Sequence, residues 1–249
     1  MHNFFVDNKD KNGDKYYITG TDLNHIKNVL RMHTGDTFLV SCDGCSDLCR
    51  LCSVDDNTAV AQIIEENYND TNLPVDIYLF QGLPKADKME LIIQKTVELG
   101  VKAIVPTEMN RCVVKLEDKK KKSKQVRWQT IAESAAKQSK RSIIPEVLSV
   151  SSFKNALKLA ETMDILLVPY ENKDGMAATK SALNQIKSGM KVGIIIGPEG
   201  GFEESEIEAA TQIGGKTISL GKRILRTETA AITSVGMCML HIEMNGENL

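Results

Sequence analysis

From residue 74 onward, the sequence alternates short apolar segments with longer amphipathic ones. Short segments that are apolar throughout are typical of strands buried on both faces, as in parallel sheets covered by helices. Strands are predicted at 75–80, 101–106, 164–169, 191–196 and 217–220. Helices are predicted at 85–99, 123–139, 176–187, 203–213 and 227–243, with a further one after Ser151 or Ser152. This part of the chain is therefore predicted to be an α/β domain.

The first seventy residues or so are predicted to form a separate, smaller domain. Short strands are predicted at 4–6, 16–20, 37–42, 47–54 and 58–66, a pattern typical of a small β-barrel. One helix is predicted between them, with Thr21 as N-cap and an apolar face of Leu23, Ile26, Val29 and Leu30. The polar segment NYNDTNLP at 67–74 is the predicted linker, so the predicted domains are 1–72 and 73–249.

Four of the six cysteines lie in the segment SCDGCSDLCRLC at 41–52. Zinc-binding C-x2-C pairs normally come from two tight turns set well apart in the sequence, whereas here the two pairs are nearly adjacent. Asp43-Gly44 is a strong turn dipeptide between two apolar runs and predicts a β-hairpin. In a strand, Cys49 and Cys52 point to opposite faces. We therefore expect packing thiols and no metal site for Cys42, Cys45, Cys49 and Cys52.

Charge is unevenly distributed along a chain whose formal net charge is −2. Residues 111–141 contain eleven basic side chains and three acids. A basic segment in an acidic chain is typical of a polyanion-binding surface, although a lysine run also suits a solvated helix face. The sequence has no apolar run of about eighteen residues and no secretory signal at its N-terminus. We therefore expect a cytoplasmic protein with no membrane span and reduced cysteines.

The segment KVGIIIGPEGGFEESEIEAA at 191–210 predicts a ligand-binding loop. Ligands of α/β proteins bind at the carboxyl ends of parallel strands, and adjacent glycines let a ligand approach the backbone closely. The glycine patterns of dinucleotide and P-loop sites are absent. Glu203, Glu204 and Glu206 fall in the first turn of the next helix, where they would repel a phosphate, so a nucleoside without phosphates fits better. The alternative is a tight turn that requires glycine.

A second loop is predicted in ISLGKRILRTETAAITSVGMCML at 218–240. Gly221 opens a segment of cationic and polar side chains, and a helix begins after it. That helix carries several small residues, namely Ala230, Ala231, Ser234 and Gly236. Small residues permit close helix packing, either within the core or against a partner subunit.

The two loop segments, GPEGGF at 197–202 and LGKRILRTETA at 220–230, resemble the cofactor-loop signatures of the SPOUT methyltransferase superfamily. Within it, the sequence most resembles the ribosomal RNA small subunit methyltransferase E family, and the resemblance covers the whole chain. Further matching motifs, in the same order, are HIKNVLRMHTGD (25–36), LPKADKMELIIQKTVELGVKAIVP (83–106), RCVVK (111–115), RW (127–128) and AAKQSKRSIIPEV (135–147).

The resemblance implies an N-terminal PUA-like β-barrel and a C-terminal parallel-sheet domain with a deep trefoil knot. It also implies a homodimer that uses S-adenosylmethionine, without a metal, to methylate the uracil N3 of one uridine in 16S rRNA of the assembled small ribosomal subunit. Two departures concern the first domain. Asn3 stands where the family usually has an arginine, and the first 72 residues carry twelve acids against six basic residues. This composition argues against RNA contact by the barrel as a whole.

The resemblance further implies roles for individual residues. Cofactor contacts, largely through backbone groups, are expected from Pro169, Gly197, Pro198, Glu199, Gly200, Gly201, Leu220, Gly221, Ile224, Leu225, Thr229 and Ala230. RNA contacts are expected from Arg31, Lys85, Arg111, Lys137, Gln138, Lys140 and Arg141. The expected catalytic residues are Arg226, Glu228 and Arg141.

Methyl transfer to N3 requires alignment of the nitrogen with the methyl carbon and loss of the N3 proton. Glu228 and Glu199 are both candidate proton acceptors, whereas an arginine is too basic for that role. Arg226 and Arg141 are expected to stabilise charge that develops on the uracil oxygens. Three alternatives stay open: a non-catalytic RNA-binding protein with this fold, a related methyltransferase acting on tRNA or 23S rRNA, and a cysteine-based metal or redox protein.

Overall fold

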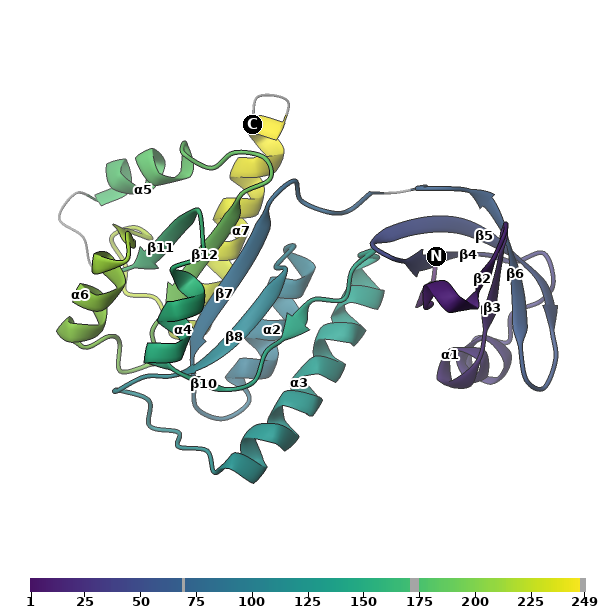
Figure 1. The fold of residues 1–249 in the computed structure, drawn as a ribbon, viewed down its shortest axis with the longest axis horizontal. Helices are drawn as coiled ribbons and strands as arrows, with labels where there is room; N and C mark the ends of the chain where they lie inside the picture. Colours follow the sequence, from purple (N-terminus) through teal and green to yellow (C-terminus); the bar gives the residue numbers. More distant parts are fainter. Residues whose placement is uncertain (69, 171–174, 247–249) are drawn as a thin grey trace. The chain divides into compact units, whose positions relative to one another are not determined.

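The computed structural model describes residues 1–68, 70–170 and 175–246. The chain divides into two compact units, whose elements are shown in Figure 1. Unit 1 comprises Met1–Asn72 and Ala136–Ile144, and unit 2 comprises Leu73–Ala135 and Pro145–Leu249. Residue 69, within the predicted linker, lies outside the described residues.

Unit 1 contains a six-stranded sheet with the order β1-β4-β5-β6-β3-β2. Its strands are β1 (Asn3–Phe5), β2 (Lys11–Asn12), β3 (Lys15–Ile18), β4 (Thr37–Cys42), β5 (Cys45–Val54) and β6 (Ala59–Glu65). β1 and β4 are parallel, and the other neighbours are antiparallel. All five strands predicted for this part of the chain are present. The PUA-like barrel stays a prediction.

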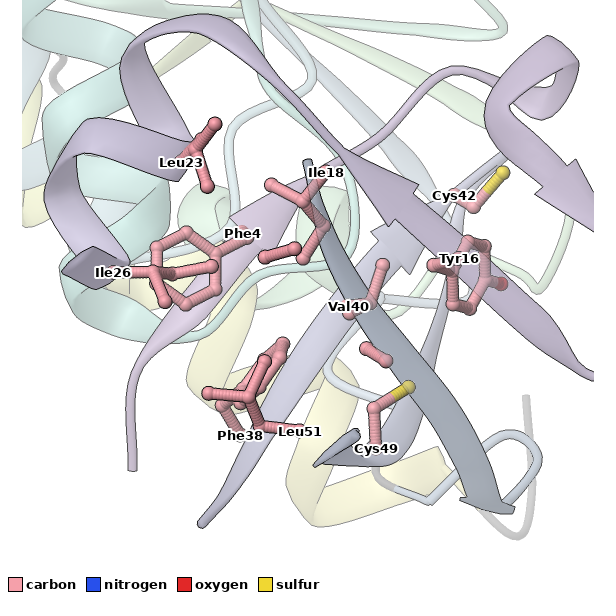
Figure 2. Packing of buried hydrophobic residues seen from close by; sticks show 12 residues of the cluster. Phe4, Tyr16, Ile18, Leu23, Ile26, Phe38, Val40, Cys42, Cys49 and Leu51 are labelled. Carbon is pink, nitrogen blue, oxygen red and sulfur yellow. The ribbon is translucent and has the colours of Figure 1, made fainter. Parts of the chain in front are cut away.

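A hydrophobic cluster fills the interior of unit 1 (Figure 2). Figure 2 shows Phe4 and Phe38 close together, and their ring centroids are 5.3 Å apart in an edge-to-face arrangement. In β3, Tyr16 and Ile18 are buried while the intervening Tyr17 is exposed. This alternation follows from the strand geometry, in which successive side chains point to opposite faces.

The helical segments of unit 1 are η1 (Asn8–Asp10), a 3-10 turn, α1 (Gly20–Asn24) and the π-helical turn η2 (His25–Val29). The N-cap of α1 is Thr19, so the prediction of Thr21 is wrong. The N–H of Leu23 donates to the carbonyl of Thr19, which places Thr21 inside the first turn.

The π-helical turn also corrects the predicted apolar face. The N–H of Leu30 donates to the carbonyl of His25, five residues earlier, at 2.9 Å. A turn closed over five residues departs from the period of an α-helix. As a result, Leu23 and Ile26 are buried and Leu30 packs partly against the core, whereas Val29 is exposed.

The cysteine segment forms the predicted hairpin. β4 and β5 pair antiparallel with Cys42 opposite Cys45. Between them, Asp43 and Gly44 have φ of 49° and 85°. Positive φ at both central residues is what a type I′ turn requires, and Asp-Gly is one of the sequences that meet this requirement.

The four thiols of this hairpin differ in environment. Cys42 and Cys49 are buried, and Cys45 and Cys52 are exposed. The prediction that Cys49 and Cys52 point to opposite faces of the strand is therefore confirmed. Within the described ranges, no group of three or more His, Cys, Asp or Glu side chains is arranged to hold a metal ion.

Residues 136–144 pack with unit 1, although the predicted domain boundary places them with 73–249. The side-chain amide of Asn3 donates to the carbonyl of Arg141 at 2.9 Å. The amide of Asn72 donates to the Ser142 hydroxyl at 2.8 Å and to the Gly44 carbonyl at 3.1 Å. Asn3, which replaces the arginine usual in the family, is thus a buried residue that satisfies backbone within unit 1.

Unit 2 contains a parallel sheet with the order β10-β8-β7-β12-β11-β13, in which β9 also pairs with β8. Its strands are β7 (Asp76–Gly82), β8 (Ala103–Glu108), β9 (Glu146–Val147), β10 (Ser151–Ser152), β11 (Ile165–Pro169), β12 (Lys191–Ile196) and β13 (Lys216–Ile218). All pairs are parallel. The predicted α/β fold with a parallel sheet is confirmed. The trefoil knot stays a prediction.

The remaining helices are α2 (Lys88–Glu98), α3 (Asp118–Ser139), α4 (Phe153–Ala160), α5 (Gly175–Leu183), α6 (Glu204–Gln212) and α7 (Thr227–Asn245). α7 packs on β7 and β12 and lies beside α2 (Figure 1). Ser152 caps α4 as predicted, because its side chain accepts a hydrogen bond from the Asn155 N–H at 3.4 Å.

Two helices begin elsewhere than predicted. α2 begins at Lys88 rather than near Lys85, and Ala86, predicted on its apolar face, is exposed in the preceding loop with φ of 53°. α3 begins at Asp118, earlier than the predicted residue 123. In the described part of the chain, no helix combines the length and apolarity needed to cross a membrane.

Candidate functional site

The loops that follow β7 and β12 lie side by side at one edge of the sheet of unit 2. These two strands are parallel neighbours, with Gln81 opposite Ile196. A Cβ atom on Gly82 would lie 2.7 Å from the backbone nitrogen of Pro198. Because this neighbour is backbone, only glycine lets the two loops approach so closely. The carboxyl ends of the strands, where α/β proteins bind ligands, therefore carry the GPEGG loop.

Glycines also shape the GPEGG loop itself. Gly201 has φ of 70°, in the left-handed region that favours glycine, and its N–H donates to the Pro198 carbonyl at 2.9 Å. A Cβ atom on Gly200 would lie 2.9 Å from the Cβ of Arg111. The guanidinium Nη1 of Arg111 donates to the Gly200 carbonyl at 3.2 Å. The tight turn considered from the sequence is present, and it holds this loop against Arg111.

A buried hydroxyl joins the two glycine loops. The Thr227 hydroxyl donates to the carbonyl of Gly197 at 2.7 Å. The same oxygen accepts a hydrogen bond from the side-chain amide of Gln81 at 3.0 Å. Thr227 and Gln81 are both buried. The start of α7, the end of β7 and the start of the GPEGG loop are thus connected by one chain of hydrogen bonds.

The N-terminus of α6 is occupied by carboxylates of the chain itself. The N–H of Glu203 donates to Glu206 Oε2 at 2.9 Å, as one half of a capping box. The N–H of Asn110 donates to the other oxygen of Glu206, also at 2.9 Å. Glu206 is buried, so a carboxylate fills the place that a phosphate takes at other helix N-termini. This geometry supports a ligand that brings no phosphate to this helix.

Three charged side chains meet beside these loops, and we call Lys88, Glu199 and Glu228 the Lys88 cluster. Lys88 Nζ lies 3.1 Å from Glu199 Oε1 and 3.2 Å from Glu228 Oε2. The backbone N–H of Lys85 also donates to Glu199 Oε1, at 3.0 Å. Each glycine-loop motif therefore contributes one carboxylate, and α2 contributes the ammonium group between them.

The charges of the Lys88 cluster follow from these contacts. Burial acts to raise the pKa of Glu199, but the Lys85 N–H and the Lys88 ammonium outweigh it, and the pKa lies below its ordinary value. Hydrogen bonds to Glu199 and Glu228 hold the pKa of Lys88 above its ordinary value. Lys88 and Glu199 are therefore both charged at neutral pH.

The segment 219–226 after β13 carries most of the other predicted cofactor residues. Its first residue is fixed by α5, since the Ser219 N–H donates to Thr179 Oγ1 at 3.0 Å and the Thr179 hydroxyl donates to the Ser219 carbonyl at 2.8 Å. Pro169 lies opposite Ile218 across the β11–β13 pair. Leu220, Gly221, Leu225 and Ala230 are half-buried, whereas Ile224, Arg226 and Thr229 are exposed.

The predicted RNA-contacting residues divide between the two units. Lys85 and Arg111, in unit 2, are exposed, and each makes a hydrogen bond to the GPEGG loop. Arg31, Gln138 and Lys140, in unit 1, are exposed. The assignment of RNA contacts to these five residues stays a prediction.

Two other predicted residues of unit 1 have protein partners. Lys137 Nζ lies 2.9 Å from Asp22 Oδ1. Arg141 is only 5% exposed, and burial lowers its pKa to about 10, so it stays protonated at neutral pH. The roles proposed for Arg141 in catalysis and RNA binding stay predictions.

Sequence reasoning did not select Lys88, Gln81 or Thr227. Two of them carry a local signal. Lys88 is a cation in the first turn of a helix, where the helix dipole disfavours positive charge. Gln81 is a polar residue at the end of an apolar strand. Thr227 carries no comparable signal, because a threonine near a helix start is common.

Comparison with known proteins gives a consistent result. Residues 71–239 match the model of the RNA methyltransferase domain family. Ribosomal RNA small subunit methyltransferase E of Bacillus subtilis is 41% identical over 233 residues, which cover 92% of this chain and 91% of that protein. The enzyme of the same name from Mesomycoplasma hyopneumoniae is 35% identical, with 96% of this chain and 99% of that protein covered.

A solved structure shares the fold as well as the sequence. Ribosomal RNA small subunit methyltransferase E from Neisseria gonorrhoeae, bound to S-adenosyl methionine, superimposes with a TM-score of 0.79 at 30% identity. The match covers 96% of this chain and 97% of that one.

Proposed function

The chain belongs to the ribosomal RNA small subunit methyltransferase E family, and on that premise we propose that it transfers a methyl group from S-adenosylmethionine to the uracil N3 of one uridine in 16S rRNA. The observation that carries this proposal is the hydrogen bond from Thr227 to Gly197, which joins the two cofactor-loop motifs at the carboxyl edge of the sheet. Two segments far apart in sequence thereby form one site.

The residues at this edge fit S-adenosylmethionine in three respects. The exposed backbone of the GPEGG loop is open to a nucleoside. The N-terminus of α6 is filled by Glu206, which suits a cofactor without phosphates. When both carboxylates are ionised, the Lys88 cluster has one excess negative charge, which suits a sulfonium cation. We assign the cofactor to the residues predicted from the loop motifs, with Gly197, Leu220 and Leu225 at its centre.

The bound cofactor supplies an electrophilic methyl group together with its own leaving group, so the chain has to supply alignment and a proton acceptor. Held in line, well-oriented reactants gain roughly 7–11 kcal/mol over free ones. The N3–H bond breaks as its proton moves to a carboxylate oxygen, while the new N3–C bond forms. Glu228 and Glu199 are the two candidates for this oxygen, and Arg226 is exposed at the N-cap of α7 for charge on the uracil oxygens.

The RNA substrate is supported by the distribution of basic side chains. Arg111 and Lys85 flank the GPEGG loop, and α3 carries the exposed Lys119, Lys120 and Lys122. Such groups bind phosphates without regard to sequence. The target base must be unpaired or turned out of its helix to reach a pocket at the sheet edge.

The remaining parts of the proposal concern assembly and topology. We propose a homodimer, supported by large apolar side chains left exposed on one chain, among them Ile224 at 97%, Leu240 at 52% and Met244 at 75%. The knot, the PUA-like barrel and a cytoplasmic location with the assembled small subunit as substrate belong to the same proposal.

Methyl transfer can be tested directly. The purified chain is incubated with methyl-labelled S-adenosylmethionine and either assembled small subunits or naked 16S rRNA, and the labelled nucleotide is mapped. We expect label at N3 of one uridine, preferentially in subunits. Label in neither substrate would overturn the enzyme assignment, and label confined to tRNA or 23S rRNA would support the related methyltransferase instead.

A further inference from the structure

Lys88 has no role in the methyl transfer described above, yet it contacts both candidate proton acceptors. Its Nζ lies 3.1 Å from a Glu199 oxygen and 3.2 Å from a Glu228 oxygen. The three side chains come from α2, from the loop after β12 and from α7, so only the folded chain brings them together. All three are partly shielded from solvent.

Resting on the proposed function, we propose that Lys88 is a positioning residue for methyl transfer: it holds the carboxylates of Glu199 and Glu228 ionised and aligned where the N3 proton is removed. Two carboxylates that share one site destabilise each other as anions, and one of them takes up a proton unless a cation stands between them. A protonated carboxyl cannot accept the N3 proton. Lys88 supplies the cation.

Other charged groups nearby do not replace Lys88. Glu199 and Glu228 are the charged groups that act on Lys88 within the described ranges. On α2, Glu90 pairs with Arg127 of α3 at 2.7 Å, and Asp87 also acts on Arg127. The neighbouring Lys85 reaches Glu199 through its backbone N–H.

The side chain itself suits a bridging role. An ammonium group has three donors pointing in different directions and can serve two carboxylates from separate elements, whereas a guanidinium presents a planar fork to one. Lys88 is partly exposed and lies in the first turn of α2. Its replacement therefore opens no cavity in the core.

The test compares Lys88→Met, Lys88→Arg and, as matched control, Lys95→Met. Lys95 lies on the same helix and pairs with Glu98 at 2.9 Å, away from the site. For each variant, kcat and KM for methylation of small subunits are measured from about pH 5.5 to 9, together with urea unfolding. We expect Lys88→Met to lower kcat by ~10-fold or more near neutral pH with little change in the KM for subunits.

The pH profile separates positioning from a merely structural role. Loss of the ammonium raises the pKa of the carboxylates, so the rate falls at a higher pH on acidification, by ~1 pH unit or more. Lys88→Arg should keep the acid limb near its wild-type position, and Lys95→Met should match the wild type. Adding Glu199→Gln to Lys88→Met removes the repulsion and should return the limb toward wild type.

The outcomes are distinct. An unchanged kcat and acid limb in Lys88→Met, with an active wild type, would overturn the role of Lys88 and leave the methyltransferase assignment in place. An inactive wild type would instead count against the proposed function. If Lys88→Met unfolds, the double variant decides: a limb still displaced upward would contradict the shared-site argument.

Discussion

Thr227 Oγ1 lies 2.7 Å from the carbonyl oxygen of Gly197, which connects the first residue of α7 to a loop 30 positions earlier in the chain. The hydroxyl is buried and also accepts from Gln81, so both of its hydrogen-bonding functions are used. Buried polar groups that lose a partner cost about 1–3 kcal/mol each. The bond therefore couples the shape of the cofactor loop to the stability of unit 2.

The first prediction follows from this bond. Thr227→Val keeps the shape of the side chain but leaves the Gly197 carbonyl and the Gln81 amide without their partner. We expect a loss of about 2 kcal/mol in the free energy of unfolding and weaker binding of S-adenosylmethionine. Urea unfolding and isothermal titration calorimetry measure the two effects. Thr227→Ser, which keeps the hydroxyl, is the control, and equal affinity in all three proteins would contradict the coupling.

The second prediction concerns the contact between Gly82 and Pro198. A methyl group at residue 82 would lie 2.7 Å from a backbone nitrogen and 2.8 Å from the proline Cδ, so the loop must shift in Gly82→Ala. We expect cofactor affinity to fall by at least about tenfold, since a displaced loop no longer aligns its groups with the ligand. Gly246→Ala is the control, because a Cβ there has no neighbour within 4 Å. Unaltered affinity in Gly82→Ala would show that the loop adapts freely.

The third prediction concerns acid stability. The pKa of Glu199 is lower in the folded chain than its ordinary value of 4.5. A carboxylate of this kind stabilises the fold above its unfolded pKa, and that contribution disappears as the pH falls through the folded pKa. Wild type should therefore be more stable than Glu199→Gln at about pH 6, with the difference vanishing below the ordinary glutamate pKa. Chemical unfolding between about pH 6 and pH 3 measures this, and a constant difference would contradict it.

The fourth prediction concerns thiol reactivity. Burial raises the pKa of Cys49 to about 12 and that of Cys238 to about 12, so both are protonated and shielded at mildly alkaline pH. Cys45 and Cys52 are exposed. Iodoacetamide should therefore modify Cys45 and Cys52 first, as mass spectrometry of peptides will show, because the thiolate is the reactive form. Early labelling of Cys49 would contradict the packing in Figure 2.

The same hairpin predicts the effect of substitution. Cys45→Ser and Cys52→Ser should leave stability and methyl transfer unchanged. Cys49→Ser should destabilise unit 1 by about 1–3 kcal/mol, because it buries a hydroxyl in the hydrophobic cluster. Loss of methyl transfer in a folded Cys45→Ser/Cys52→Ser variant would revive a chemical role for the cysteine array.

The fifth prediction concerns the lysines of α3. Replacement of Lys119, Lys120 and Lys122 by alanine should weaken subunit binding and flatten its dependence on salt, by roughly one unit of logarithmic slope for each phosphate that is no longer neutralised. Binding is measured by filter retention at several salt concentrations. The control replaces Lys154, Lys158 and Lys187, which are exposed elsewhere in unit 2. Equal slopes in the two triple variants would indicate a solvated helix face.

Local sequence determined most elements of the fold, because strand and helix periods depend on residues a few positions apart. The apolar runs predicted the central strands of unit 2, and Asp43-Gly44 predicted the hairpin turn from its need for positive φ. Local rules failed where the backbone departed from them. The π-helical turn exposed Val29, and the loop before α2 took Ala86 out of the helix.

The candidate site could be predicted only in part. The loop motifs pointed to Gly197 and its neighbours, since glycine and a strand end are visible in the sequence. The tertiary structure alone decided that Thr227 binds Gly197 and that Lys88 lies between Glu199 and Glu228. These contacts join residues that no local period relates. They exist because the parallel strand order brings the end of β7, the loop after β12 and the start of α7 to one edge.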